Sequence, residues 1–330
     1  MNTRIALTFA LTTATLAVAF GCDDDNNNTD SNPEDERVTW ATGVQAIVAR
    51  RCMGCHVAGG VAPFVLESYD DVKAVASAVR FSVESGSMPP LQTDPDCQPF
   101  FNDNRLPSDE REALLEWLDQ GLPEGNVEGF EPVKPFVDVL DDTDLVLRPH
   151  APYEPPAHAL DNYHCLPLDN TFEEPVWVTG HELIPDAQDL VHHVILYLVP
   201  PSGAAAMEAE DEANPGPGYP CYGTSGHGGQ PMGVWAPGGG PQRFPENSAF
   251  EIPAGSRVVA QMHYNTSSGQ VRPDHSRLHL RTVSEAPELR VQMPILNGFF
   301  EIAAGQEQSF DFSYTFEEGM TAKMRCSGMP

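Results

Sequence analysis

Basic residues are scarce in this sequence of 330 residues: 18 Lys and Arg stand against 48 Asp and Glu, which gives a formal net charge of −30. Proteins that bind nucleic acid or an anionic membrane surface need patches of positive charge. The composition therefore argues against both partners. Acidity of this degree is typical of a well-solvated surface and indicates no particular substrate.

Long hydrophobic runs are equally scarce, and the one in residues 5–20 follows a basic residue and precedes Cys22. This run is short for a transmembrane helix and is typical of a secretory signal peptide. Residues 17–22 resemble a bacterial lipoprotein signal, in which the cysteine becomes the lipidated first residue. We therefore expect removal of residues 1–21, a lipid anchor on Cys22, and export to a periplasm or cell surface. Ordinary cleavage nearby, with Cys22 incidental, is the alternative.

Apolar side chains are also missing from the segment that follows. Residues 23–37 are almost all Asp, Asn, Glu, Ser and Thr and offer nothing to a hydrophobic core. Such a composition cannot offset the entropy lost on folding. We expect residues 22–37 to form a disordered acidic tether between the lipid anchor and the folded part.

The run Cys52-Met-Gly-Cys55-His56 is the most informative stretch of the chain. A Cys-x-x-Cys-His run is typical of c-type haem attachment: two thiols bond to the haem, and the adjacent imidazole is an axial iron ligand. A redox dithiol or half of a zinc site is the alternative. Zinc needs a second ligand pair at finger-like spacing, and a thioredoxin-like motif needs a βαβ pattern. The sequence has neither, so we expect haem c at Cys52, Cys55 and His56.

Helical periodicity surrounds this motif in residues 38–128. We expect one helix before Cys52, a second capped by Ser68, and a third capped by Ser108. This order resembles the single-haem cytochrome c fold. Met88 precedes two prolines between the second and third helices, and thioether ligation raises the potential of a His/Met haem. Although methionine is more often packing material, we expect Met88 to be the second axial ligand. Residues 129–149 are polar and proline-bearing and are expected to be a linker.

Helical periodicity is absent from residues 150–284, where short apolar runs alternate with Pro- and Gly-rich turns. Strands at this spacing predict an all-β sandwich. Residues 202–231 are rich in Gly, Pro, Ala and Glu and are expected to form a long loop. The expected strands are 176–178, 190–199, 232–236, 256–264 and 278–283.

Three histidines, His192, His193 and His263, stand in otherwise apolar strands. Buried imidazoles need hydrogen-bond partners or a metal, and imidazole suits copper, zinc, iron and nickel alike. Adjacent strand residues point to opposite faces, so His192 and His193 can reach one metal only at a strand end or a distortion. Their chemistry alone leaves both a three-histidine metal site and buried structural histidines open.

Several sequence motifs, taken in their order along the chain, bear on the choice between these two alternatives. They are Tyr163-His-Cys165-Leu-Pro, Val191-His-His-Val-Ile-Leu-Tyr197, Cys221, Val234-Trp-Ala-Pro-Gly-Gly239, Ile252-Pro-Ala-Gly255 and Gln261-Met-His-Tyr-Asn265. Their order resembles the N-terminal domain of the copper type II, ascorbate-dependent monooxygenases, the family of peptidylglycine α-hydroxylating monooxygenase and dopamine β-monooxygenase. The resemblance implies a jelly-roll-like antiparallel β-sandwich in which His192, His193 and His263 hold an electron-transfer copper.

The resemblance also implies a disulfide between Cys165 and Cys221. Export makes the remaining Cys97 and Cys326 candidates for disulfides too. Four other histidines match no ligand position of the family, and we expect them to be solvent-facing or hydrogen-bonded. They are His181, His227, His275 and His279.

The family's second copper binds oxygen and is held by a His-x-His pair and a Met in a second β-sandwich. No histidine follows His279 here, and the sequence holds no His-x-His pair. We can identify no catalytic residue in this chain. Residues 285–330 resemble the opening strands of an incomplete second β-domain, so we expect a fragment or frameshifted product of a longer enzyme. A natural haem and copper electron carrier is the alternative.

These expectations combine into an exported copper-dependent monooxygenase with a fused c-type haem. A donor protein or small reductant would supply electrons to the haem and then to copper. In an intact family member, O2 hydroxylates a C–H bond of an organic substrate, and one oxygen atom leaves as water. A non-catalytic haem/copper electron-transfer lipoprotein is the main alternative, and a metal-free structural β-sandwich is a third.

Overall fold

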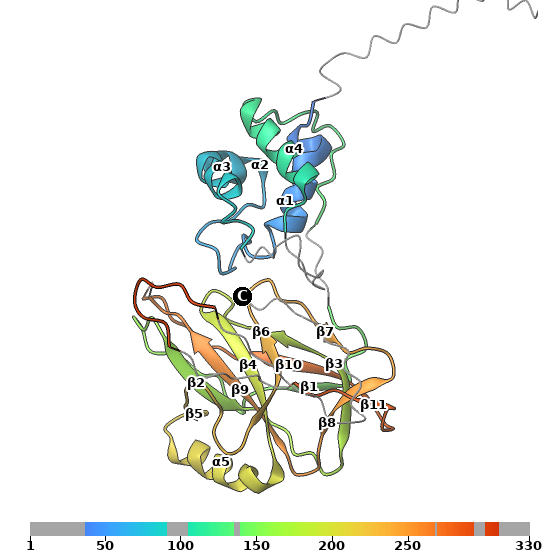
Figure 1. Ribbon diagram of the computed structural model, residues 1–330, viewed down its shortest axis with the longest axis vertical. Helices are drawn as coiled ribbons and strands as arrows, with labels where there is room; N and C mark the ends of the chain where they lie inside the picture. Colours follow the sequence, from blue (N-terminus) through green and yellow to red (C-terminus); the bar gives the residue numbers. More distant parts are fainter. Residues whose placement is uncertain (1–36, 91–104, 135–138, 268, 294–300, 310–330) are drawn as a thin grey trace, which may run out of the picture. The chain divides into compact units, whose positions relative to one another are not determined.

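The computed structural model describes residues 37–90, 105–134, 139–267, 269–293 and 301–309 (Figure 1). Cys22, Cys97 and Cys326 lie outside these residues, as do the expected signal peptide and tether. Within the described part of the chain, no helix has the length and apolar character needed to cross a membrane.

The first described residues are helical, as predicted, and they share a core around Trp40, Val48 and Trp117. Each of these side chains is at most 4% exposed, so the helices are held by packing more than by propensity. The helices are the π-helix η1 (Trp40–Val44), α1 (Gln45–Arg51), α2 (Tyr69–Ala74), α3 (Ala76–Glu84) and α4 (Ser108–Asp119).

The helix caps test the sequence analysis in detail. Ser68 caps α2 as predicted: its hydroxyl accepts from the Asp71 N–H, and the Asp71 carboxylate accepts from the Ser68 N–H. The expected single helix breaks at Val75, with φ −117° and ψ 19°, which separates α2 from α3. The Ser108 cap is wrong, because Ser108 is the first residue of α4 and Pro107 holds the capping position.

The first residues of the expected linker lie against α1. The Gln45 side chain donates to the Val133 carbonyl at 2.7 Å, and the Val133 N–H donates back to the same amide at 2.8 Å. These two bonds give both the NH2 group and the carbonyl oxygen of the buried Gln45 side chain a hydrogen-bond partner. The helical part therefore includes contacts from residues beyond 128.

The later residues form two sheets that are mostly antiparallel, so the expected β-rich class is confirmed (Figure 1). The first sheet has the order β1-β10-β3-β8-β11, with β7 also paired to β3, and the second has the order β5-β2-β9-β4-β6. The strands are β1 (Leu145–Leu147), β2 (Asn162–Pro167), β3 (Val176–Ile184), β4 (Val191–Val199), β5 (Tyr219–Pro220), β6 (Gln230–Trp235), β7 (Gln242–Arg243), β8 (Ser248–Ile252), β9 (Arg257–Tyr264), β10 (Arg277–Val283) and β11 (Leu289–Arg290).

The two sheets share one hydrophobic core. Val178 and Leu280 enter it from the first sheet, and Val194 and Met262 enter it from the second; all four are fully buried. Because strand side chains alternate between faces, the residues next to these point away from the core. His193 and His263 are such residues, and they therefore lie on the outer face of the second sheet.

The expected long loop over 202–231 is wrong. It contains α5 (Pro201–Ala213), which begins with a proline at its first helical position, and the short strand β5. Met207 of α5 is fully buried in a second cluster with Cys165 and Tyr197 of the second sheet. The helix thus covers part of the outer face of that sheet.

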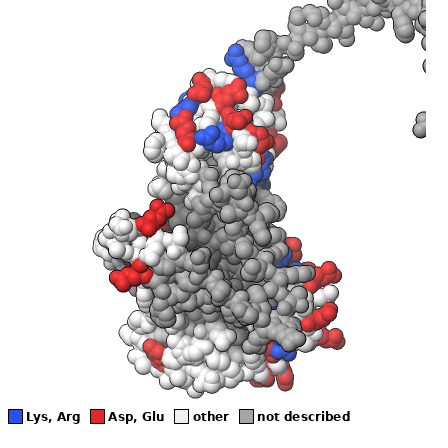
Figure 2. Space-filling view, viewed as in Figure 1, with Lys and Arg blue, Asp and Glu red and all other residues white. Residues whose placement is uncertain are grey.

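The last described strand, β11, pairs in parallel with β8 at the edge of the first sheet. Its residues were expected to open a second β-domain. Residues 294–300 and 310–330 lie outside the described part, so the second domain stays a prediction. On the face of the molecule in Figure 2, acidic side chains outnumber basic ones among the coloured residues.

Candidate metal centre

Three side chains form a row across the outer face of the second sheet. In the antiparallel ladders, His263 of β9 lies directly opposite Tyr163 of β2 on one side and His193 of β4 on the other. Directly opposed side chains on one face of a sheet are close neighbours. The backbone register therefore brings two of the three predicted ligands together.

His192 joins them through a distortion of β4. Val191 pairs with Tyr264 and His193 pairs with His263, so the register shifts between Val191 and His193 and leaves His192 as the extra residue. An extra residue of this kind is a β-bulge, and it re-aims a side chain. This is the distortion that strict alternation requires before adjacent histidines can share a site.

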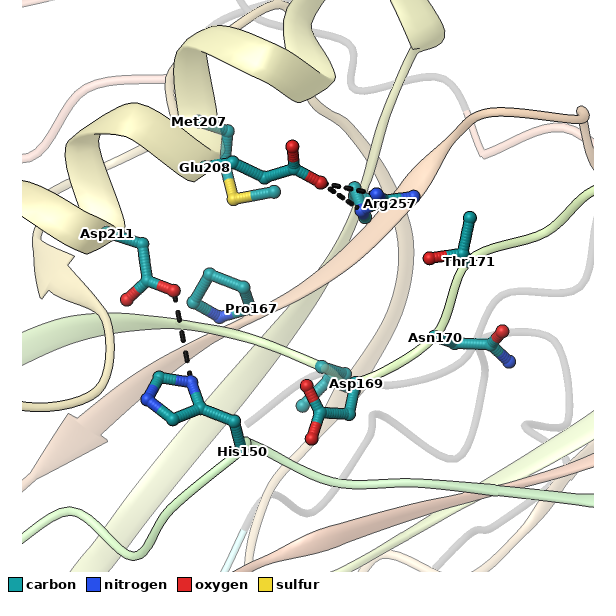
Figure 3. A pocket seen from close by; sticks show the side chains of 10 residues that line it. His150, Pro167, Asp169, Asn170, Thr171, Met207, Glu208, Asp211 and Arg257 are labelled. Atoms are coloured by element: carbon teal, nitrogen blue, oxygen red, sulfur yellow. Dashed lines mark hydrogen bonds and ion pairs between the residues drawn. The ribbon is translucent and has the colours of Figure 1, made fainter.

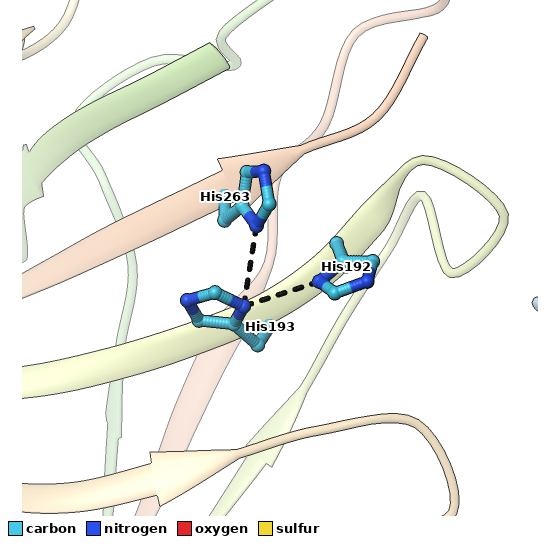
Figure 4. Close-up of side chains that lie close together, drawn as sticks. All are labelled: His192, His193 and His263. Carbon is cyan, nitrogen blue, oxygen red and sulfur yellow. Dashed lines mark hydrogen bonds between the residues drawn. The ribbon is translucent and has the colours of Figure 1, made fainter. Parts of the chain in front are cut away.

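The histidine trio (His192, His193 and His263) converges through its Nδ1 atoms (Figure 4). The Nδ1 of His193 lies 3.2 Å from the Nδ1 of His192 and 3.2 Å from the Nδ1 of His263. Nitrogen ligands about 2 Å from one ion stand roughly 3–3.5 Å apart. Two pairs of the trio have this spacing, and all three ligand atoms lie within 4.8 Å of one another. Three ligands also leave room for a further one on the exposed His192 side.

The surroundings favour the neutral form of two of these rings, His193 and His263. Burial, followed by the neighbouring His263 and His192, lowers the pKa of His193 to about 4. Burial also lowers the pKa of His263, and the Asp161 carboxylate opposes that shift. Because a metal binds the unprotonated imidazole, the lowered pKa values of His193 and His263 favour the form of these two ligands that binds.

A disulfide and two tyrosines flank the trio. Cys165 and Cys221 are bonded, the pairing that the family resemblance implied. Tyr163 stacks on the His263 ring with centroids 4.2 Å apart and an angle of 7°, and Tyr222, 80% exposed, meets Tyr163 edge-on at 4.9 Å. The stacked ring restricts rotation of the His263 side chain.

The haem motif follows directly from α1, with Cys52 at its C-cap. Both thiols are free in this structure, and burial, followed by Cys55, raises the pKa of Cys52 to about 12. Burial raises the pKa of Cys55 as well. A redox-active dithiol needs an accessible thiolate, which these environments disfavour. The thiols therefore fit covalent attachment to haem better than the dithiol alternative.

A backbone carbonyl holds the His56 ring in place. Its ring is 9% exposed, and its Nδ1 lies 2.9 Å from the Phe64 carbonyl oxygen. A carbonyl accepts only from a protonated nitrogen, so this contact assigns the proton to Nδ1 and the lone pair to Nε2. The residues at positions 52, 55 and 56 thus fit a c-type haem.

Met88 lies among the described residues, and its role as the second axial haem ligand stays a prediction. Its backbone N–H bonds to the Ser82 carbonyl at 3.1 Å, which fixes the loop after α3. Its side chain is 41% exposed, and Phe81 in the same helical part is 71% exposed. Single exposed apolar side chains are normal on a protein surface, so the exposure of Met88 by itself assigns it no role.

The four histidines left outside the site have other roles. His227 bonds Glu210 at 2.7 Å and His275 bonds the Pro149 carbonyl at 2.9 Å, as expected, and His279 contacts Thr143. His181 differs from a solvent-facing residue because it is 2% exposed, and its Nε2 has no partner among the described residues. Burial lowers the pKa of His181 to about 4, and a hydrogen bond with Gln242 opposes that shift.

A cavity of about 190 Å³ lies away from the trio (Figure 3). It is lined by Arg257, the first residue of β9, whereas His263 lies six residues further along the same strand. At about 3.3 Å per residue, roughly 20 Å separates them. Within the cavity Glu208 pairs with Arg257, and His150 lies 4.0 Å from Asp211. The cavity is therefore separate from the candidate metal centre.

Among the described residues, the trio is the one group of His, Cys, Asp and Glu side chains assembled at metal-ligand spacing. Neither a scan against protein-family models nor a search of the curated proteins finds a match for this chain. The functional argument therefore depends on the geometry of the two candidate sites. Sequence reasoning missed Asp161, whose contact with His263 appears only once β2 is paired with β9.

Proposed function

We propose that this protein is an oxidoreductase of the copper-monooxygenase type, in which electrons pass from a c-type haem to copper held by the histidine trio. The main support for the proposal is the convergence of three histidine Nδ1 atoms. The β4–β9 register brings His193 next to His263, and the bulge in β4 adds His192. The two sheets with a shared core support an antiparallel β-sandwich, and the helices around Cys52 and His56 support a cytochrome c unit.

Copper in such a site supplies one-electron chemistry by cycling between its two common oxidation states. The chain's own residues define the conditions for it. Imidazole ligands bring no negative charge, so they favour the higher oxidation state of copper less than carboxylate ligands would. The exposed His192 leaves one side of the site open to solvent, and the buried His263 fixes the other.

The residues of the haem motif and Met88 also have distinct roles in the proposal. Haem stores one electron at a potential set by its axial ligands. Cys52 and Cys55 would form the two thioethers, His56 would present Nε2 to the iron, and Met88 would complete the axial pair. The Phe64 carbonyl holds the His56 ring in place through Nδ1.

The wider proposal places the protein outside the cell's cytoplasm, attached to a membrane through a lipid on Cys22. Its electron donor would be a protein or a small reductant. Its reaction class would be O2-dependent hydroxylation of an organic C–H bond. A second candidate is a non-catalytic haem and copper electron carrier, since the haem motif at Cys52, Cys55 and His56 and the histidine trio are the two groups that such an electron path needs.

Anaerobic electron transfer within the protein tests the proposal. Haem is reduced, excess reductant is removed, and one equivalent of Cu(II) is added while haem absorbance and the Cu(II) paramagnetic signal are followed. We expect one haem to be oxidised per Cu(II) reduced, and faster than in the His263→Ala variant. His227→Ala, which removes an imidazole outside the trio, is the matched control.

Equal rates in wild type and His263→Ala would contradict electron transfer through the trio. Oxygen-dependent product formation from candidate substrates then separates the two functions. Transfer to copper without any product under O2 and reductant supports the carrier, and product formation supports the monooxygenase.

A further inference from the structure

His263 differs from the other two histidines of the trio at its second ring nitrogen. Its Nε2 lies 2.8 Å from a carboxylate oxygen of Asp161. Neither His192 nor His193 has a carboxylate partner of this kind in the part of the chain that the structure describes. The Asp161 carboxylate therefore binds His263 at the ring nitrogen that does not face the other two histidines.

The position of Asp161 follows from the sheet. Asp161 directly precedes β2, and Tyr163 is the β2 residue paired with His263. Residues two apart on an extended strand lie on the same face, so Asp161 and Tyr163 both approach the His263 ring. Tyr163 covers the face of the ring, and Asp161 binds its Nε2 edge.

The contact also defines the chemical state of the ring. A carboxylate accepts, so the Nε2 of His263 carries the proton and Nδ1 keeps the lone pair that converges with the other two Nδ1 atoms. Asp161 is not itself a ligand, because the two ring nitrogens of an imidazole point in nearly opposite directions. Carboxylates behind metal-bound histidines orient the ring and raise its basicity.

We infer that Asp161 is a positioning residue that orients His263 and biases the trio toward the more highly charged state of its metal. A negative charge near the site interacts more strongly with a doubly charged than with a singly charged ion. Its removal therefore weakens Cu(II) binding more than Cu(I) binding. This inference rests on the proposed copper site and adds a redox preference to it.

The test measures Cu(II) and Cu(I) affinities separately, by competition with chelators, for the full chain at about pH 8, above the usual titration range of histidine. Asp161→Ala removes the charge and the acceptor, whereas Asp161→Asn keeps an acceptor oxygen and removes only the charge. We expect Asp161→Ala to lose 10- to 100-fold in Cu(II) affinity, the range typical of such partners, with a smaller loss for Cu(I). Asp161→Asn should lie between it and wild type.

Asp141→Asn is the matched control, since it removes an exposed carboxylate outside the trio. Equal loss of Cu(II) and Cu(I) affinity would assign Asp161 a purely structural role and overturn the redox bias. Unchanged affinities in Asp161→Ala would overturn the inference and leave the copper site intact. A wild-type chain that binds no copper would instead overturn the proposed function, and this inference with it.

Discussion

His193 and His263 face each other directly across the β4–β9 ladder, with their Nδ1 atoms 3.2 Å apart, although 70 residues separate them in sequence. Strand side chains have a period of two, so a slip of one residue in this ladder would move His193 to the opposite face. The register of one strand pair therefore determines whether the site exists.

The first prediction concerns the metal ligands. Replacement of His193 or His263 by alanine should abolish stoichiometric copper binding, from about one ion per chain in wild type, because each change removes one of the three nitrogen ligands. Metal analysis after dialysis measures this. His227→Ala should retain wild-type copper. Two ions per chain, or full retention in His263→Ala, would contradict the assignment.

The second prediction concerns the haem. Met88→Ala should lower the haem reduction potential, because a thioether ligand favours the ferrous state. Axial ligands set haem potentials over a range of about 0.8 V, so the change should be well resolved by redox titration. Met88→His restores a sixth ligand but not the thioether, and it should also lower the potential. A potential unchanged in both variants would remove Met88 from the axial pair.

The third prediction concerns the buried His181. Its pKa of about 4 in the folded state lies below the ordinary value near 6.5, so the unfolded chain binds more protons between these pH values. Stability is therefore full above about pH 6.5 and falls as the pH approaches 4, by roughly 3 kcal/mol from this group.

Urea unfolding of the metal-free protein across this pH range measures the effect. His181→Leu should remove the His181 share of the slope, because leucine has no titrating group. The control variant His150→Gln, also measured without metal, alters a histidine whose side chain is 49% exposed. A slope identical in wild type and His181→Leu would contradict the prediction.

The fourth prediction concerns Asp274, a fully buried carboxylate beside the metal-binding strands. It accepts from the Tyr264 hydroxyl at 2.9 Å, the Ser276 hydroxyl and the Ala187 N–H, and so ties the end of β9 to the loop before β4. Tyr264→Phe removes one donor from a buried charge and should destabilise the protein by about 1–3 kcal/mol.

Tyr222→Phe is the matched change at a tyrosine that is 80% exposed, and it should stay within about 0.5 kcal/mol of wild type. Chemical denaturation compares the two variants. Equal stabilities would show that the Tyr264 hydroxyl does not support the network.

The strongly apolar strands and the periodic helices before residue 128 could be predicted from the sequence, whereas α5 and β2 could not. β4 and β9 carry long runs of Val, Ile, Leu and Ala, which predict strands whatever surrounds them. α5 was missed because the composition was judged over all of residues 202–231. Its Ala and Glu favour a helix, but the Gly- and Pro-rich residues that follow it obscured this preference. The strand β2 was missed for a similar reason, since its Asn, Tyr and His follow no clear alternation.

The candidate site divides in the same way. Alternation alone showed that His192 and His193 need a distortion to share a metal, and the β4 bulge supplies it. The position of that bulge could not be derived, because it depends on pairing with a strand 70 residues away. Asp161 lies 102 residues from His263, so its contact is likewise a product of the register and not of any local pattern.

The sequence distance between His193 and His263 has a consequence for how this chain folds. No short segment holds the complete trio, so an unfolded chain offers copper at most the adjacent His192 and His193, and the three-histidine site requires the β4–β9 ladder. A metal that binds only the folded state stabilises it by mass action, by about 2.7 kcal/mol when its free concentration is 100 times the dissociation constant. The supply of copper would then influence how long each newly folded molecule survives, as well as what it can do.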